Sequence, residues 1–138
     1  MKEAQILKRC PGAGLRGVAR LPDYRIDFTI SAPERWRGGG CADIVVDRGS
    51  EVWGLLYEMS ADDLNRLDTA EGSRYRRVEL PVTNESGMTV RAFAYEVVDK
   101  APSKCPAREY LNIIKDAARS YHFPKSYTQY LDSIEVQG

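Results

Sequence analysis

The sequence contains a single histidine, His122, and its three cysteines, Cys10, Cys41 and Cys105, are widely separated. No two cysteines form a CxxC pair and none lies near a second histidine, so the ligand spacings of a zinc site are missing. An odd number of distant cysteines is also not the pattern of a disulfide-stabilised secreted domain. We therefore expect no metal site, no disulfide framework and reduced thiols in a cytoplasmic protein.

The chain also lacks an excess of charge and a long hydrophobic run. Lys+Arg and Asp+Glu each number 20, which gives no reason to expect a nucleic acid or an anionic membrane as partner. No apolar run approaches the roughly 20 residues needed to cross a bilayer, and the first residues, MKEAQILKRCPG, are too polar for a signal peptide. With 138 residues, the sequence is expected to form one domain over residues 1–138 with its own core.

What the sequence does contain is a series of alternating segments followed by helical ones. Apolar and polar residues alternate in Tyr24–Ile30, which predicts a half-buried strand, and Pro22-Asp23 and Asp47–Ser50 are predicted to be turns. The expected strands are Gly17–Leu21, Tyr24–Ile30, Ala42–Val46, Val52–Tyr57, Tyr75–Thr83 and Met88–Val98, and the expected helices are Met1–Arg9, a short one after Ser60, Ala107–Ser120 and Lys125–Ile134. This order predicts an α+β domain with a strongly bent or barrel-like sheet and helices packed outside it.

The most informative segment is Val52–Gly72, VWGLLYEMSADDLNRLDTAEG. Its first residues are the β-branched, aromatic and aliphatic types that suit a strand. Ser60 then has the character of a helix N-cap, with Asp63 three residues later. Gly72 is the residue type that commonly ends a helix. The segment therefore predicts that Glu71 lies at the C-terminal end of a short helix.

Three local effects are expected to raise the pKa of Glu71. The negative end of the helix dipole disfavours a carboxylate, Asp68 is a like charge three residues earlier on the same face, and burial under Trp53 or Tyr75 would disfavour the charged form. A carboxyl group with a raised pKa suits general acid–base catalysis near neutral pH. The alternative is a solvated residue at a helix end, because perturbed carboxylates are a minority class.

The triplet Gly38-Gly39-Gly40 has a functional and a structural interpretation. Glycine would let a backbone approach a ligand closely. However, no Lys-Ser/Thr pair follows the triplet and no GxGxxG spacing is present, so nucleotide binding is weakly supported and a flexible turn is favoured.

Three further groups of side chains are open to the same two interpretations. A run of arginines beside Tyr75 would suit an anionic substrate, although a charged strand face is the more common case. His122 is interpreted as a surface residue, and the tyrosines of the last two helices as core and rim residues. The arginines concerned are Arg74, Arg76 and Arg77, and the tyrosines are Tyr110, Tyr121, Tyr127 and Tyr130.

Four segments match, in order along the chain, the motifs of one family. Cys10–Phe28, CPGAGLRGVARLPDYRIDF, is similar to a strand pair of the form ARLpgYrLdF, and Trp36–Ala42, WRGGGCA, is similar to a W-x-G-G-x-A turn. Val52–Gly72 followed by Tyr75 is similar to the signature VwGvly.ls…dl..LD..EG….Y, and Pro106–Ala118 more weakly to P…Y…I..GA. Together these segments resemble the γ-glutamylcyclotransferase-like family, which includes the plant AIG2-like proteins.

The resemblance implies a site and a reaction. Glu71, the glutamate of LD..EG, would be the catalytic acid–base. The substrate-binding residues implied by the matching positions are Tyr75, Tyr110, Trp36, Gly38 and Gly39. The implied fold is a small mixed β-barrel-like sheet with flanking helices. The implied reaction cyclises a small γ-glutamyl substrate to 5-oxoproline and releases the attached amine, with no metal or organic cofactor required.

One motif of the family is not found in this sequence. The family opens with a strand and loop reading YGSN(L/M), whose backbone amides hold the substrate and stabilise the developing oxyanion. The sequence from Met1 onward contains no such motif. The alternative interpretation is therefore a non-catalytic binding or interaction domain of the same fold. That alternative predicts exposed sheet edges that pair across a homodimer.

Overall fold

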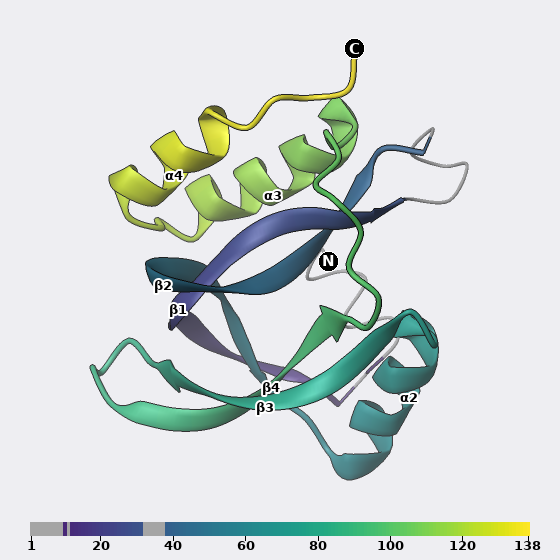
Figure 1. Cartoon of the computed structure of the whole chain (residues 1–138). Coiled ribbons are helices and arrows are strands. Elements are labelled where there is room, and N and C mark those ends of the chain that lie inside the picture. The colour runs from purple at the N-terminus through teal and green to yellow at the C-terminus, as the bar shows by residue number, and fades with distance from the viewer. Residues whose placement is uncertain (1–9, 11, 32–37) are drawn as a thin grey trace.

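The computed structural model describes Cys10 and residues 12–31 and 38–138. This part of the chain contains, in order, β1 (Gly14–Ser31), β2 (Gly40–Glu58), α2 (Ala61–Glu71), β3 (Tyr75–Thr83), β4 (Thr89–Val97), α3 (Arg108–Ser120) and α4 (Lys125–Asp132). The predicted α+β class is confirmed. The helix predicted for Met1–Arg9 lies outside the described residues. Figure 1 shows α3 and α4 together on one side of the strands, and α2 beside β3 and β4 at the other end.

β1 and β2 form one long antiparallel hairpin where two pairs of short strands were predicted. The turns predicted at Pro22-Asp23 and Asp47–Ser50 are wrong, because these two segments face each other within the ladder. The register shifts there, and the Gly49 N–H donates to Asp23 Oδ1 at 3.0 Å across the irregularity. Asp23 has a φ of 65° and Gly49 a φ of 88°. The ladder therefore bends at this point, as it does at a bulge, and does not end.

β3 and β4 form the second hairpin, and a turn at Asn84–Gly87 connects them. The four strands have the order β2-β1-β3-β4, and all described pairings are antiparallel. β3 meets β1 at one described pair, Arg20 with Thr83. Most of β3 therefore has a ladder partner on one side only, which is where a proline such as Pro81 is tolerated in a sheet.

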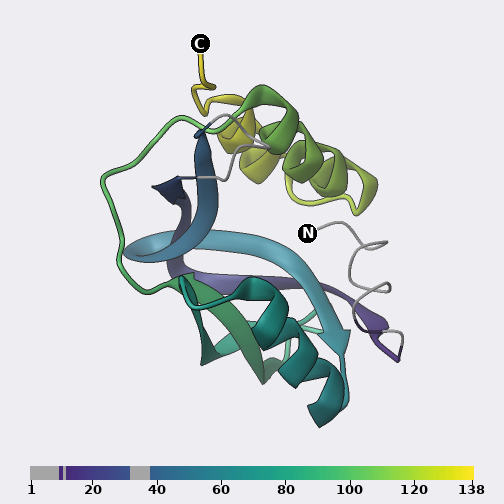
Figure 2. The ribbon, with the colours of Figure 1, turned by 90° about the vertical axis from the view of Figure 1, so that its right-hand side faces the viewer.

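The curled sheet brings its two outer strands, β2 and β4, close to each other. Asp43 of β2 is buried and accepts hydrogen bonds from the Val97 N–H of β4 at 2.8 Å and from Thr29 of β1 at 2.7 Å. Lys100 Nζ lies 2.7 Å from the same carboxylate. No backbone ladder joins β2 to β4 among the described residues. The sheet is therefore barrel-like but open, as the two views in Figures 1 and 2 show.

The core is divided between the two ends of the molecule. Ala118, Tyr127 and Leu131 of α3 and α4 are buried against the β1–β2 hairpin. Leu67 of α2 forms a second cluster with Cys10, packed against side chains of β2 and β4. The helix predictions for Ala107–Ser120 and Lys125–Ile134 agree with α3 and α4 to within two residues at each end. None of the described helices has the length and apolar character to span a membrane.

Candidate active site

The helix that carries Glu71 begins and ends at the predicted residues. Ser60 is the N-cap of α2, and its Oγ accepts the Asp63 N–H at 3.1 Å. At the other end, Gly72 has a φ of 81°, a conformation that favours glycine. The Gly72 N–H donates to the Asp68 carbonyl at 3.1 Å. Local capping chemistry therefore fixes Glu71 as the last residue of the helix.

The charged residues of α2 suit the helix dipole at the N-terminus of the helix but not at its C-terminus. Asp62 and Asp63 lie in the first turn, where the helix dipole stabilises negative charge, and the last turn contains no basic residue. Glu71 is half-buried at the negative end. The predicted helix-end position of Glu71 is present, and the residue is also partly buried.

The like charge predicted to act on Glu71 is largely compensated. Arg77 Nη1 lies 3.2 Å from Asp68 Oδ2, and the Tyr95 hydroxyl donates a short hydrogen bond to Asp68 Oδ1. Burial raises the pKa of Tyr95, and the hydrogen bond to Asp68 raises it further, so Tyr95 keeps its proton. These contacts tie the last turn of α2 to β3 and β4. They position the helix end and reduce the repulsion expected between Asp68 and Glu71.

Glu71 acts electrostatically on the two tyrosines singled out from the sequence. Burial raises the pKa of Tyr110 to about 12, and Cys41 and Glu71 add to this rise while the hydrogen bond from the Ala42 N–H opposes it. Burial raises the pKa of Tyr75 as well, and its neighbours Tyr110, Cys41 and Glu71 contribute in the same direction. Both hydroxyls therefore stay protonated at neutral pH. The charge of Glu71 thus acts in the same direction on both tyrosines.

The two tyrosine hydroxyls meet at the start of β2. The Tyr75 hydroxyl donates to the Ala42 carbonyl at 3.0 Å, and the Tyr110 hydroxyl accepts the Ala42 N–H at 2.9 Å. Next to them, burial raises the pKa of the Cys41 thiol, Arg74 lowers it and Glu71 raises it. The two tyrosines therefore clamp one residue of β2, Ala42, through its backbone. Neither Ala42 nor Cys41 was singled out from the sequence.

The glycine triplet makes a close backbone approach, but to another part of this chain. A Cβ on Gly40 would lie 2.6 Å from the Lys104 carbonyl and 2.7 Å from Phe28 Cβ. The Gly40 N–H also donates to the Cys105 carbonyl at 3.1 Å. Gly38 lies in an exposed turn with a φ of 72°, and Gly39 is buried. Trp36, predicted beside them, lies outside the described residues.

Glu71 lines a cavity of about 510 Å³ that lies between β2, α2, β4 and α3. Tyr75 and Tyr110 are not part of the described lining of this cavity. Tyr95 lines the cavity together with Phe93 and Arg91. Because these three residues alternate along β4, their common face could have been predicted from the strand period. Their position in the same cavity as Glu71 could not have been predicted from the sequence, because it depends on how β4 packs against α2.

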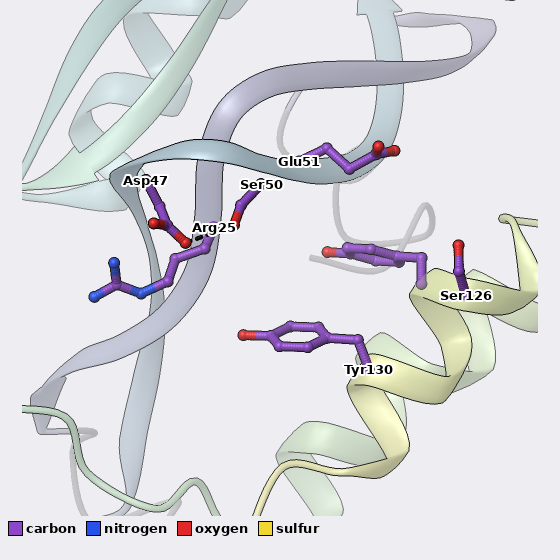
Figure 3. Close-up of a pocket in the computed structure, with 7 residues that line it drawn as sticks. Arg25, Asp47, Ser50, Glu51, Ser126 and Tyr130 are labelled. Atoms are coloured by element: carbon purple, nitrogen blue, oxygen red, sulfur yellow. Dashed lines mark hydrogen bonds between the residues drawn. The ribbon is translucent and has the colours of Figure 1, made fainter.

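A second, smaller cavity of about 240 Å³ shares no described lining residue with the first. Figure 3 shows Arg25, Asp47 and Glu51 on the strands, with Tyr130 reaching toward them from α4. Ser50 Oγ donates to Asp47 Oδ2 at 2.5 Å. The Asp47 carboxylate therefore already accepts a hydrogen bond from another residue that lines this cavity. The cavity lies at the α4 end of the molecule, and its described lining contains none of the residues predicted for the site.

The arginines around Tyr75 are engaged in the fold. Arg74 Nη2 donates to the Ser31 carbonyl at 2.8 Å, and Arg76 Nη2 lies 2.5 Å from Glu96 Oε1. Arg77 pairs with Asp68, as described above. The interpretation as a charged strand face is therefore favoured over an anion site.

Two remaining sequence interpretations concern the surface and metal binding. His122 is exposed, as predicted. Within the described residues, no group of three His, Cys, Asp or Glu side chains is arranged to hold a metal ion.

Comparison with known proteins gives a consistent result. A model of the AIG2-like family matches residues 51–131, which include α2 and Glu71. Human γ-glutamylcyclotransferase is 34% identical over 135 residues that cover 92% of this chain and 70% of the human protein, and the mouse protein is 33% identical with the same coverage. A solved structure of a γ-glutamyl cyclotransferase superposes with a TM-score of 0.88 at 31% identity, covering 97% of this chain and 82% of that chain. The chain therefore belongs to the γ-glutamylcyclotransferase family, of the AIG2-like type.

Proposed function

We propose that this protein is a γ-glutamyl cyclotransferase that converts a small γ-glutamyl substrate to 5-oxoproline and a free amine. The similarity to proteins of that name supports the reaction class. The single observation that carries the proposal is the position of Glu71, half-buried at the negative end of α2 and lining a cavity. A cavity of about 510 Å³ is within the roughly 300–1,000 Å³ typical of small-molecule sites.

The proposed reaction needs few protein groups because the nucleophile and the electrophile belong to one molecule. The α-amine of the γ-glutamyl group attacks its own γ-carbonyl carbon, a five-membered lactam forms, and the bond to the leaving nitrogen breaks. Holding the chain in the attack geometry supplies much of the rate acceleration. Glu71 takes a proton from the α-ammonium group and later gives one to the leaving nitrogen, in the manner of a general base and then a general acid.

The other predicted site residues take a supporting part in the proposal. Tyr75 and Tyr110 hold Ala42, and with it the start of β2, and both feel the charge of Glu71. Direct contact of the substrate with these tyrosines, or with Trp36, Gly38 and Gly39, stays a prediction. All three cysteines are free thiols, in keeping with the further proposal that the protein acts in the cytoplasm.

The test is release of 5-oxoproline from a panel of γ-glutamyl amino acids and γ-glutamyl amines. Wild type should release 5-oxoproline and amine in equal amounts, and Glu71→Gln should reduce the rate at least about a hundredfold. The matched control is Asp62→Asn, which makes the same carboxyl-to-amide change at an exposed position of α2. A folded wild type that is as inactive as Glu71→Gln across the whole panel would contradict the proposal.

The same preparations test the alternative of a non-catalytic interaction domain. That alternative predicts a homodimer joined through the free edge of β2 or β4, measured by light scattering, and no turnover. The comparisons favour the enzyme.

A further inference from the structure

The cavity beside Glu71 has walls that are mainly apolar. β2 contributes Trp53 and Tyr57, β4 contributes Phe93, and α3 contributes Ile114 and Ala117. Phe93 is 51% exposed, which places it at the mouth of the cavity, while Trp53, Tyr57, Ile114 and Ala117 are half-buried. An engineered cavity of about 150 Å³ is enough to hold benzene. The space beside Glu71 is therefore large enough for a phenyl ring or a branched aliphatic chain together with part of the glutamyl group.

The charges in this cavity are few, and one of them is already paired. Among the described lining residues, Glu71 and Arg91 are charged. The guanidinium of Arg91 donates to Glu79 Oε1 at 3.1 and 3.2 Å and is exposed. A charged or amide side chain entering the cavity would lose water against walls that are mainly apolar, which is costly. An apolar side chain would gain by leaving water.

From this lining we infer that the cavity receives the leaving group of the substrate, and that the enzyme selects γ-glutamyl compounds whose leaving amine carries an aromatic or branched aliphatic side chain. The inference rests on the proposed function, since Glu71 lies on the wall of this same cavity and must reach the leaving nitrogen to protonate it. When the nitrogen is held at Glu71, the side chain attached to it extends along the apolar walls. Specificity then arises from burial of that side chain.

The first experiment compares substrates of equal size. Leucine and asparagine side chains have the same number of heavy atoms, so γ-glutamyl-leucine and γ-glutamyl-asparagine differ in polarity and little in shape. We expect kcat/KM for γ-glutamyl-leucine to be at least about tenfold higher, the lower end of what an apolar pocket achieves. Equal kcat/KM values for the two compounds would overturn the inference and leave the proposed function standing.

The second experiment changes the wall. Ala117→Leu adds bulk inside the cavity, whereas Asn112→Leu adds the same side chain at an exposed position of the same helix. The Ala117 variant should reduce kcat/KM more for γ-glutamyl-phenylalanine than for γ-glutamyl-alanine, by about tenfold in the ratio. The Asn112 variant should leave that ratio unchanged. An equal ratio in the two variants would overturn the inference.

A binding measurement separates failure of the cavity inference from failure of the proposed function. N-glutaryl-leucine and N-glutaryl-asparagine lack the α-amine and cannot cyclise, so calorimetry reports binding without turnover. Tighter binding of N-glutaryl-leucine to wild type, weakened by Ala117→Leu and not by Asn112→Leu, supports the inference even if no γ-glutamyl compound is cyclised. Equal affinity for the two compounds overturns it, whatever the outcome of the activity assay.

Discussion

The two ends of helix α2 are built in opposite ways. At the N-terminus, the Ser60 side chain caps the helix, and two aspartates, Asp62 and Asp63, lie where the dipole stabilises negative charge. At the C-terminus, Asp68 and Glu71 lie where the dipole opposes negative charge, and the last turn has no basic residue. The charges at the first end follow the rules that stabilise helices, and the charges at the second end depart from them.

This difference separates stability from function within one helix of eleven residues. Positions where a sequence breaks local rules are expected at functional sites, with compensation from the surroundings. Here Arg77 and the Tyr95 hydroxyl compensate Asp68 through contacts from β3 and β4. The N-terminal end should therefore respond to mutation mainly in stability, and the C-terminal end mainly in activity.

The largest expected effect is that of exchanging a carboxylate for an amide at the two ends. Glu71→Gln should lower the rate of 5-oxoproline release at least about a hundredfold. Its free energy of unfolding should stay equal or rise by up to about 1 kcal/mol, because a charge leaves the negative end of the dipole. Asp62→Asn should keep the activity and lose about 0.3–1 kcal/mol of stability. Kinetic assays and urea unfolding of the two proteins measure both quantities. If the two variants lose activity and stability by similar amounts, the distinction between the ends is refuted.

The second largest effect is expected from the contacts that compensate the Asp68 carboxylate at the C-terminal end of α2. Tyr95→Phe removes the hydrogen bond to Asp68 and should cost about 1.5–3 kcal/mol of stability, the range for a bond to a charged group. Tyr130→Phe is the matched control, since its exposed hydroxyl donates to the Ile26 carbonyl at 3.2 Å. The control should lose about 0.5–1.5 kcal/mol. Chemical denaturation reports both values, and a Tyr95 variant no less stable than the control would show that this contact does not anchor the helix end.

A smaller effect is expected from removal of the N-cap. Ser60→Ala leaves the Asp63 N–H without its side-chain acceptor and should cost about 1 kcal/mol. The kcat/KM for any γ-glutamyl substrate should be unchanged, because Ser60 lies at the end of α2 away from Glu71. Activity is measured well below the unfolding temperature of the variant. A loss of kcat/KM in the folded variant would mean that the two ends of α2 are not independent.

The last effect appears only at alkaline pH. The pKa of Tyr110 in the folded protein is about 12, above its ordinary value of about 10. Folding therefore favours the protonated hydroxyl, and this contribution to stability is complete below pH 10 and is lost as the pH rises from about 10 to about 12.

Tyr110→Phe removes this ionisable hydroxyl and tests whether its ionisation lowers the stability of the folded protein between about pH 10 and about pH 12. Over the same pH interval, the free energy of unfolding should fall less steeply in the variant than in wild type. Other buried tyrosines still titrate in both proteins, so the slope is reduced and not abolished. Urea unfolding at several pH values gives the two slopes, and equal slopes would contradict the burial of the Tyr110 hydroxyl.

Short-range chemistry explains which parts of the fold could be predicted from the sequence. The bounds of α2 were predictable because a cap at Ser60 and a glycine at Gly72 act within one turn of the helix. The β3–β4 hairpin was predictable because alternation and the turn at Asn84–Gly87 agree. The turns predicted at Pro22-Asp23 and Asp47–Ser50 failed because turn residues that face each other across a long ladder can form a bulge instead.

Long-range packing explains what was missed at the site. Compensation of Asp68 by Arg77 and Tyr95, and the clamp on Ala42 by two tyrosines, join residues from different elements. No local pattern around Ala42 indicates that its backbone is held by hydroxyl groups. The position of Glu71 was predictable from its own helix, but its neighbours depend on how that helix meets the sheet.

Chemical rescue tests the central claim, that the Glu71 carboxylate moves the protons of the cyclisation, most directly. Glu71→Ala removes the carboxylate and leaves space for a small acid, so 5-oxoproline release is measured with increasing concentrations of formate. A folded variant that is inactive alone and regains activity in a saturable way, while wild type does not respond to formate, is the predicted result. A Glu71→Ala protein that is as active as wild type without formate would contradict the claim.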